Sequence, residues 1–151
     1  MSATTRRPRP GETHGVDYWF LSDEEFDERV RAGEFVEHAE YSGRRYGTLR
    51  SELETRGSAG RPVVLEIEVQ GARQVRAAMP ETVQVFIAPP SRDALRARLI
   101  GRGTDDPEQV ERRLATAERE LEAQGEFTRV VINDRLEDAV DELEAIVRSA
   151  I

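Results

Sequence analysis

The first sixty residues carry short, mixed patterns of apolar and polar positions. Ser22 opens a capping box, in which a serine and a glutamate three residues later satisfy each other's backbone N–H groups, and it predicts a helix that ends at Gly33. Residues 34–41 alternate between apolar and polar side chains, which is typical of a strand. Thr48 can then cap a short helix that runs to Gly57. These patterns predict a separate mixed lobe.

A regular alternation of strands and helices begins after this lobe. Strands are expected over residues 63–69, 83–88 and 130–132, and helices over 71–79, from Ser91 to Ile100, from Pro107 to Leu121 and from Leu136 to Ile151. Helices that follow strands in this order place the strands side by side in a parallel sheet, with the helices on its faces. The pattern therefore predicts an α/β core.

Composition limits the classes of protein to which the chain can belong. Its 151 residues suffice for one domain with small inserted lobes, and 38% hydrophobic against 34% charged residues gives a core under a heavily solvated surface. A net charge of -8 disfavours nonspecific binding to nucleic acid or to an anionic membrane. The absence of cysteine excludes disulfides and thiolate metal sites, and no apolar run has the length of a membrane span or a signal peptide. We therefore expect a soluble, cytoplasmic protein.

The basic residues are all of one kind, because every one of the 22 Lys and Arg residues is an arginine. A P-loop of the form GxxxxGK(S/T) uses a lysine to hold the phosphates that are transferred. The chain as written therefore contains no such loop.

Two arginines near the start of the chain are the first candidates for chemistry. Pro8 and Pro10 stiffen the segment around Arg6 and Arg9, so that both guanidinium groups can converge on one phosphate. Arg-Pro repeats also occur as solvated basic tails that bind nothing. The two arginines alone leave both interpretations open.

Two glutamates lie near the end of the predicted strand 63–69. Ligands of open α/β sheets bind at the carboxyl ends of the strands, so Glu66 and Glu68 are candidates for a binding site there. The alternative is that the alternation of the strand merely exposes them to water. We favour the site, because the strands of a parallel sheet are usually buried on both faces.

The spacing of the N-terminal segment resembles the signature of the guanylate kinase family, whose members transfer a phosphoryl group from ATP to GMP. The matching residues follow the pattern TTR-x-x-R-x-x-E-x-x-G-x-x-Y-x-F from Thr4 to Phe20. Further matching motifs follow in the same order as far as Asn133, so the resemblance covers nearly the whole chain. It implies an α/β fold with the parallel-sheet core of a P-loop nucleoside monophosphate kinase, incomplete because the first strand and the P-loop are absent, with an inserted GMP-binding lobe and a helical lid.

The resemblance also implies a division of the chain within a single guanylate kinase-like domain. We expect a GMP-binding lobe over residues 1–60, core over 61–97, a lid over 98–122 and core again over 123–151.

Eight residues correspond by resemblance to the ligands of GMP. Four match positions that bind its phosphate, Arg6, Arg9, Tyr18 and Tyr46, and four match positions that bind guanine, Ser2, Glu37, Thr48 and Glu68. The chemistry of the base agrees, because the N–H groups of guanine need a carboxylate and its O6 needs a donor. The family commonly has aspartate where Glu68 stands, and without the family context Glu37 would be interpreted as an ordinary strand residue.

The arginine-rich segment after residue 97 resembles the family's mobile lid. Arg98, Arg102 and Arg113 correspond to catalytic arginines that fold over the phosphates of ATP. The alternative is a solvated helix surface on which arginines pair with acidic neighbours. Those neighbours are Glu108, Glu111 and Glu118.

Two further residues correspond to the ATP side of the family's site. Asn133 matches a residue beside the adenine, and Arg135, two residues later, stands where a second aspartate is usual. Glu66 matches an acid that supports Mg²⁺ without binding it directly. The expected cofactor is therefore Mg²⁺, bound together with ATP.

We expect a guanylate kinase that phosphorylates GMP to GDP with ATP in purine nucleotide metabolism and that binds neither nucleic acid nor membrane. Because the motif begins at Ser2, the chain as written lacks the family's first strand and P-loop and is expected to be inactive. A reading frame that starts too late and a real loss of the segment would both produce this chain. A real loss would leave a kinase-dead module that binds GMP or a protein, as in membrane-associated guanylate kinase scaffolds. The joint presence of the ligand residues favours the late start.

Overall fold

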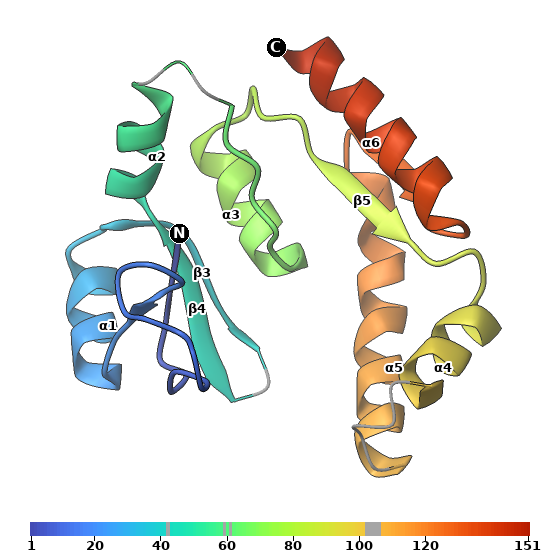
Figure 1. The fold of residues 1–151 in the computed structure, drawn as a ribbon, viewed down its shortest axis with the longest axis horizontal. Helices are drawn as coiled ribbons and strands as arrows, with labels where there is room; N and C mark the ends of the chain where they lie inside the picture. The colour runs from blue at the N-terminus through green and yellow to red at the C-terminus, as the bar shows by residue number, and fades with distance from the viewer. Residues whose placement is uncertain (42, 59, 61, 102–106) are drawn as a thin grey trace. The chain divides into compact units, whose positions relative to one another are not determined.

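The computed structural model describes residues 1–41, 43–58, 60, 62–101 and 107–151. The chain divides into two compact units, Met1–Thr82 and Val83–Ile151, which are named unit 1 and unit 2 (Figure 1).

Unit 1 contains a sheet whose strands lie in the order β2–β1–β4–β3. The strands are β1 (Ser2–Thr4), β2 (Trp19–Phe20), β3 (Phe35–Tyr41) and β4 (Arg44–Leu49). β4 pairs antiparallel with both β3 and β1, and β1 pairs in parallel with β2. The strand predicted over residues 34–41 is confirmed. The strands β1 and β2 were not predicted, because they are short and their partners lie far away in the sequence, so no local pattern marks them.

Three helices complete the described part of unit 1: α1 (Asp23–Arg31), α2 (Arg50–Gly57) and α3 (Val69–Ala78). All three confirm the predicted helices. The capping box of α1 is present, because Ser22 accepts the N–H of Glu25 and Glu25 accepts the N–H of Ser22. The prediction that Thr48 caps α2 is wrong. Leu49 holds the cap position without a side-chain hydrogen bond, and Thr48 belongs to β4.

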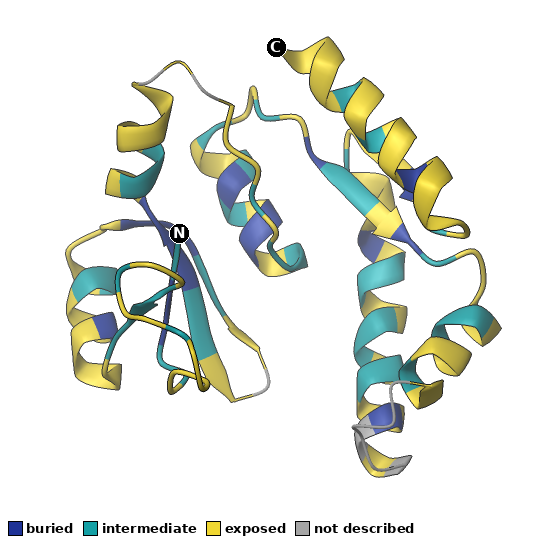
Figure 2. Ribbon diagram, in the orientation of Figure 1, coloured by how far each residue is buried: buried dark blue, intermediate teal, exposed yellow. Residues whose placement is uncertain are grey.

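The core of unit 1 joins α1 to the sheet. Phe26 of α1 stacks on Phe35 of β3 with ring centroids 4.5 Å apart, and Ala3 and Leu49 complete the cluster from β1 and β4. Phe26 and Ala3 are fully buried. Figure 2 shows buried segments, in dark blue, on α1 and on the sheet. This cluster holds β1 against the β3–β4 hairpin, and β1 leads directly into the arginine-rich segment.

Residues 62–68 form no strand, so the prediction of a buried strand over 63–69 is wrong. Val64 in this segment is 78% exposed. No described strand runs beside the segment, and a β-branched sequence without a partner has no ladder of hydrogen bonds to join. Glu68 at its end is instead the N-cap of α3, where its carboxylate accepts the N–H of Gly71.

In its described residues, unit 2 contains two parallel strands together with helices. The elements are β5 (Val85–Ala88), α4 (Arg92–Gly101), α5 (Pro107–Glu122), the 3₁₀ helix η1 (Ala123–Glu126), β6 (Arg129–Ile132) and α6 (Leu136–Ala150). β5 pairs with β6 in parallel along its whole length. The strands, the helices and the parallel pairing predicted here are confirmed. None of the helices in the described ranges of the chain combines the length and apolar character that crossing a membrane requires.

Candidate functional site

A bulge in β3 brings Glu37 opposite Thr48. Phe35 pairs with Leu49, and after one extra residue Glu37 pairs with Thr48. Regular antiparallel pairing would place Glu37 opposite Gly47 instead. Both side chains are buried, and the Thr48 hydroxyl donates a hydrogen bond of 2.6 Å to Glu37 Oε1. The bulge therefore creates a buried carboxylate that is fixed by one hydroxyl.

Ser2 and Glu68 lie beside this buried pair. Ser2 is opposite Thr48 in the β1–β4 ladder. Glu68 caps α3, and this helix comes so close that a Cβ on Gly71 would lie 2.6 Å from Glu37 Oε2. The structure thus brings together the four residues that the family resemblance assigns to guanine. We name them the carboxylate cluster.

Burial and charge both act against the ionised form of Glu37. Removal from water raises its pKa most, and the negative charge of Glu68 raises it further. Hydrogen bonds from the hydroxyl and the backbone N–H of Thr48 act in the opposite direction, and the net result is a pKa above the ordinary value of 4.5. A ligand that brings N–H donors to this carboxylate would restore the interactions that burial has removed. The cluster is therefore suited to a base with N–H groups along one edge.

The raised pKa predicts how stability changes with pH. The folded protein keeps the Glu37 proton over a pH range in which the unfolded chain releases it, so this site lowers stability as the pH rises from 4.5 through the raised pKa. Glu37→Gln removes the ionisation. We expect the free energy of unfolding of this variant, minus that of the parent, to increase between about pH 4 and about pH 7 in urea titrations. A difference that stays constant with pH would contradict this expectation.

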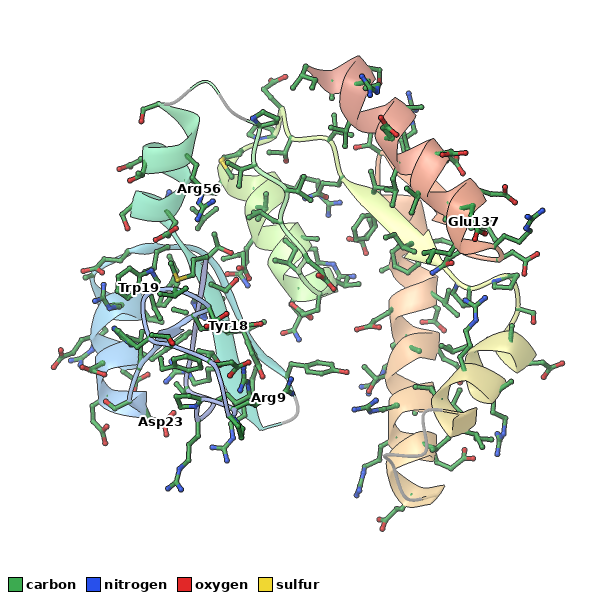
Figure 3. The ribbon with its side chains drawn as sticks, in the orientation of Figure 1. Arg9, Tyr18, Trp19, Asp23, Arg56 and Glu137 are labelled. Carbon is green, nitrogen blue, oxygen red and sulfur yellow. The ribbon has the colours of Figure 1, made fainter. Side chains whose placement is uncertain are left out.

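The arginine-rich segment is folded around Glu12. Arg6 binds the Glu12 carboxylate through two parallel hydrogen bonds of 2.9 Å, and the backbone N–H of Arg9 donates to Glu12 Oε2 at 2.7 Å. The hydrogen bonds from Arg6 hold the pKa of Glu12 below its ordinary value. The Arg9 side chain is exposed at the surface of unit 1 (Figure 3). Glu12 therefore ties both arginines to one short loop.

The Arg6 guanidinium keeps two N–H groups for another ligand. Three of its five donate to the Glu12 carboxylate and to the carbonyl of Arg7. The other two, on Nε and Nη2, share one edge and have no hydrogen-bond partner in the described part of the chain. Cζ of Arg6 lies 5.2 Å from the centroid of the Tyr18 ring, and Tyr46 lies within electrostatic reach of the same charge. An edge with two parallel donors is the geometry that binds phosphate.

A cavity of about 520 Å³ lies in unit 1, lined mainly by β1, α2 and residues 62–67. Three of the eight residues assigned to GMP line it, namely Ser2, Tyr18 and Thr48 (Tyr18 is labelled in Figure 3). The other five lie outside its lining. Thr48 connects the cavity to the buried Glu37 through its hydroxyl. The cavity therefore opens next to the carboxylate cluster.

Arg98 and Asn133 come together in unit 2. The Arg98 guanidinium donates to the backbone carbonyls of Asn133 and Asp134 at 2.7 and 3.0 Å. Arg98 thus holds the turn that follows β6. Arg113 lies half-buried on α5, and Arg102 lies outside the described residues.

Part of the arginine-rich region forms a solvated surface, as the alternative interpretation proposed. Exposed ion pairs with N–O distances of 2.6 to 3.3 Å join Arg92 to Glu118, Arg96 to Glu111 and Arg112 to Glu108. Pairs of this kind contribute little to stability. The roles of Arg98, Arg102 and Arg113 stay predictions.

Glu66, the residue predicted to support Mg²⁺, is exposed and lines the cavity of unit 1. The described residues contain no group of three or more His, Cys, Asp or Glu side chains placed to hold a metal ion. Mg²⁺ that accompanies ATP needs no such group, because phosphates and water supply most of its ligands.

Two residues that support the site were given no role by the sequence. Glu12 orients Arg6, and an acid inside a proline-stiffened, arginine-rich segment is a signal that could have indicated this ion pair. Thr4 is fully buried at the end of β1, where its hydroxyl donates to the carbonyl of Arg45 and accepts the N–H of Arg6. It fixes the point at which Arg6 leaves the sheet. No local pattern marks such a residue, because its partner lies 41 positions away.

Known proteins that are similar to this chain include several guanylate kinases. The sequence model of guanylate kinase matches residues 1–150. A guanylate kinase of Streptomyces coelicolor is 57% identical over 146 residues, which are 97% of this chain and 74% of the relative. One from Thermobifida fusca is 52% identical, over 97% of this chain and 75% of the relative. The crystal structure of guanylate kinase from Anaplasma phagocytophilum matches with a TM-score of 0.80 at 36% identity, and covers 98% of this chain and 72% of that one. The fold is thus that of guanylate kinase, and the chain belongs to the guanylate kinase family.

Proposed function

We propose that this chain binds GMP through unit 1 as the phosphoryl acceptor of an ATP-dependent kinase. The proposal rests on one observation. The carboxylates of Glu37 and Glu68 lie close to the hydroxyl residues Ser2 and Thr48 in a largely buried part of unit 1. The same unit holds Arg6, with two N–H groups left for an anion. One unit therefore offers partners for both ends of a guanine nucleotide.

The carboxylate cluster fits the edge of guanine. The N1–H and N2–H groups would donate to the carboxylates of Glu37 and Glu68, and O6 would accept a hydrogen bond from the Ser2 hydroxyl. Thr48 would hold Glu37 in place, because its one hydroxyl proton is donated to that carboxylate. Adenine has an acceptor at N1 and no amino group at C2, so it would leave buried carboxylates without donors. Sites of this kind discriminate between two bases by roughly 10⁴.

The arginine cluster, made of Arg6, Arg9, Tyr18 and Tyr46, fits the phosphate of the nucleotide. The Nε and Nη2 groups of Arg6 would bind two phosphate oxygens in parallel. Arg9, on the same loop, would add a second positive charge, and the two tyrosines would donate from their hydroxyls. Glu12 would keep Arg6 in place before the ligand arrives.

In an enzyme that carries a P-loop, which the sequence of this chain does not contain, ATP together with its Mg²⁺ would supply the phosphoryl group. An oxygen of the GMP phosphate forms a bond to the γ-phosphorus while the bond from that phosphorus to the bridging oxygen breaks, and ADP leaves with the electron pair. Arg98, Arg102 and Arg113 would neutralise the charge on the transferred group. Asn133 would contact the adenine, and Glu66 would support Mg²⁺ through its water ligands.

Calorimetric titration of the 151-residue protein with GMP and with AMP tests this proposal. GMP should bind at least about 100-fold more tightly than AMP. The two nucleotides share the ribose and the phosphate, so the ratio of their affinities reports the base alone. Equal affinities, or no binding of GMP at millimolar concentration, would contradict the proposal.

A further inference from the structure

Gln74 of α3 holds the edge of the sheet through its side-chain amide. The amide oxygen accepts the N–H of His38 at 3.1 Å, and the amide nitrogen donates to the carbonyl of His38 at 2.7 Å. His38 lies on β3, which is the edge strand of the sheet. The Gln74 amide thus binds the outer edge of β3 as a further strand would. We name this pair of hydrogen bonds the Gln74 clamp.

The clamp connects the two elements that carry the carboxylates. His38 directly follows Glu37 on β3, and Gln74 stands six residues after Glu68, the N-cap of α3. Because a helix advances a fixed distance of about 1.5 Å per residue, holding it at Gln74 also fixes its N-cap relative to β3. The clearance at that end is small, since a Cβ on Gly71 would lie 2.6 Å from Glu37 Oε2.

Apolar packing alone would not fix this position. Ala72 and Val75 of α3 are buried and hold the helix against the rest of unit 1. The hydrophobic effect is non-directional, so it brings surfaces together without setting how far one element slides along another. Two directional hydrogen bonds to one residue of β3 do set it.

We propose that Gln74 is a positioning residue, which sets the spacing of Glu37 and Glu68 and thereby the preference of the protein for GMP over IMP. The inference rests on the proposed function. GMP can engage both carboxylates at once through N1–H and N2–H, whereas IMP lacks the 2-amino group and can engage only one. Two carboxylates act together only at the right spacing, but a single one tolerates a small displacement.

Titration of Gln74→Leu with GMP and with IMP tests the inference. Leucine keeps much of the volume of glutamine but neither accepts nor donates a hydrogen bond. We expect the loss of two hydrogen bonds to reduce the affinity for GMP about tenfold and that for IMP about twofold at most. A merely structural role would lower both affinities by the same factor. Gln70→Leu, at an exposed position one turn earlier on α3, is the matched control and should keep the parental ratio.

Amide hydrogen exchange measures the clamp itself, because the N–H of His38 should exchange faster in Gln74→Leu than in the parent. Where circular dichroism shows that this variant does not fold, Gln74→Glu replaces it. Glutamate keeps the acceptor for the His38 N–H but places a carboxylate oxygen against the His38 carbonyl, and it should reduce the GMP-to-IMP ratio in the same way. The inference is overturned if a folded Gln74 variant keeps the parental ratio of the affinity for GMP to the affinity for IMP. Failure of the parent itself to bind GMP overturns the proposed function, and the inference with it.

Discussion

Glu37→Ala should lower the affinity for GMP by roughly 10²–10³ and leave the affinity for AMP nearly unchanged. The Glu37 carboxylate is buried and is held by Thr48 at 2.6 Å, so it is in place before the base arrives. Without it, N–H groups of guanine would be buried without an acceptor. That cost falls on GMP alone, because adenine has no donors at the same positions. Calorimetric titration with both nucleotides measures the change.

Glu40→Ala is the matched control for this variant. Glu40 lies on the same strand as Glu37 but is exposed. Its removal should leave both affinities at the parental values. If the two alanine variants bind GMP equally well, Glu37 does not contact the base.

Arg6→Ala should weaken the binding of GMP and of AMP alike, by roughly 10²–10³. Both nucleotides carry the phosphate that the Nε and Nη2 groups of Arg6 are proposed to bind. Arg6→Lys keeps the positive charge but loses the edge with two parallel donors, so it should restore only part of the affinity. Titrations at constant ionic strength measure these changes, because salt weakens interactions between charges near the surface.

Arg7→Ala separates the geometry of Arg6 from simple positive charge. Arg7 is the next residue and is exposed, and it contacts Arg6 through its backbone carbonyl, which alanine retains. We expect little change in affinity. A loss as large as that of Arg6→Ala would mean that the segment attracts anions by its overall charge.

The two patterns of loss are distinct. A defect confined to GMP indicates contact with the base, and a defect shared by GMP and AMP indicates contact with the phosphate. Each variant therefore tests one end of the proposed nucleotide site independently of the other.

Sequence patterns predicted the elements whose stabilising contacts are local. The capping box of Ser22 satisfies the first turn of α1 within four residues, and the alternation of residues 34–41 predicted β3. The parallel pairing of β5 with β6 also followed from the order of strands and helices. In each case the pattern that predicts the structure lies within one segment of the sequence or in the order of the strands and helices along the chain.

Elements that depend on distant partners could not be predicted in this way. Residues 62–68 have the composition of a strand, but no described strand lies beside them, so they form no strand and are largely exposed. The short strand β1 depends on β4, more than forty residues later in the chain. Composition gives the preference of a segment for a strand, and pairing decides whether one forms.

The residues of the candidate site also differ in whether a local motif identifies them or contacts with distant segments place them. The motif of the N-terminal segment identified Arg6 and Tyr18 as candidates, and in the structure Cζ of Arg6 lies 5.2 Å from the centroid of the Tyr18 ring. The bulge that turns Glu37 towards Thr48 depends instead on the register between two strands. The amide of Gln74 likewise finds its partner 36 positions away. Residue types could therefore be named from the sequence, whereas their spacing is set by contacts between distant segments.

We propose that GMP binds in unit 1 with its base at Glu37 and Glu68 and its phosphate at Arg6. A ¹⁵N NMR titration of the labelled protein with GMP tests this mode of binding. We expect saturable shifts of the amide signals of Thr48 and Gly71 and of the Arg6 Nε–H signal, with the two amide signals far less affected by AMP. Shifts confined to unit 2, or none at millimolar GMP, would contradict the claim.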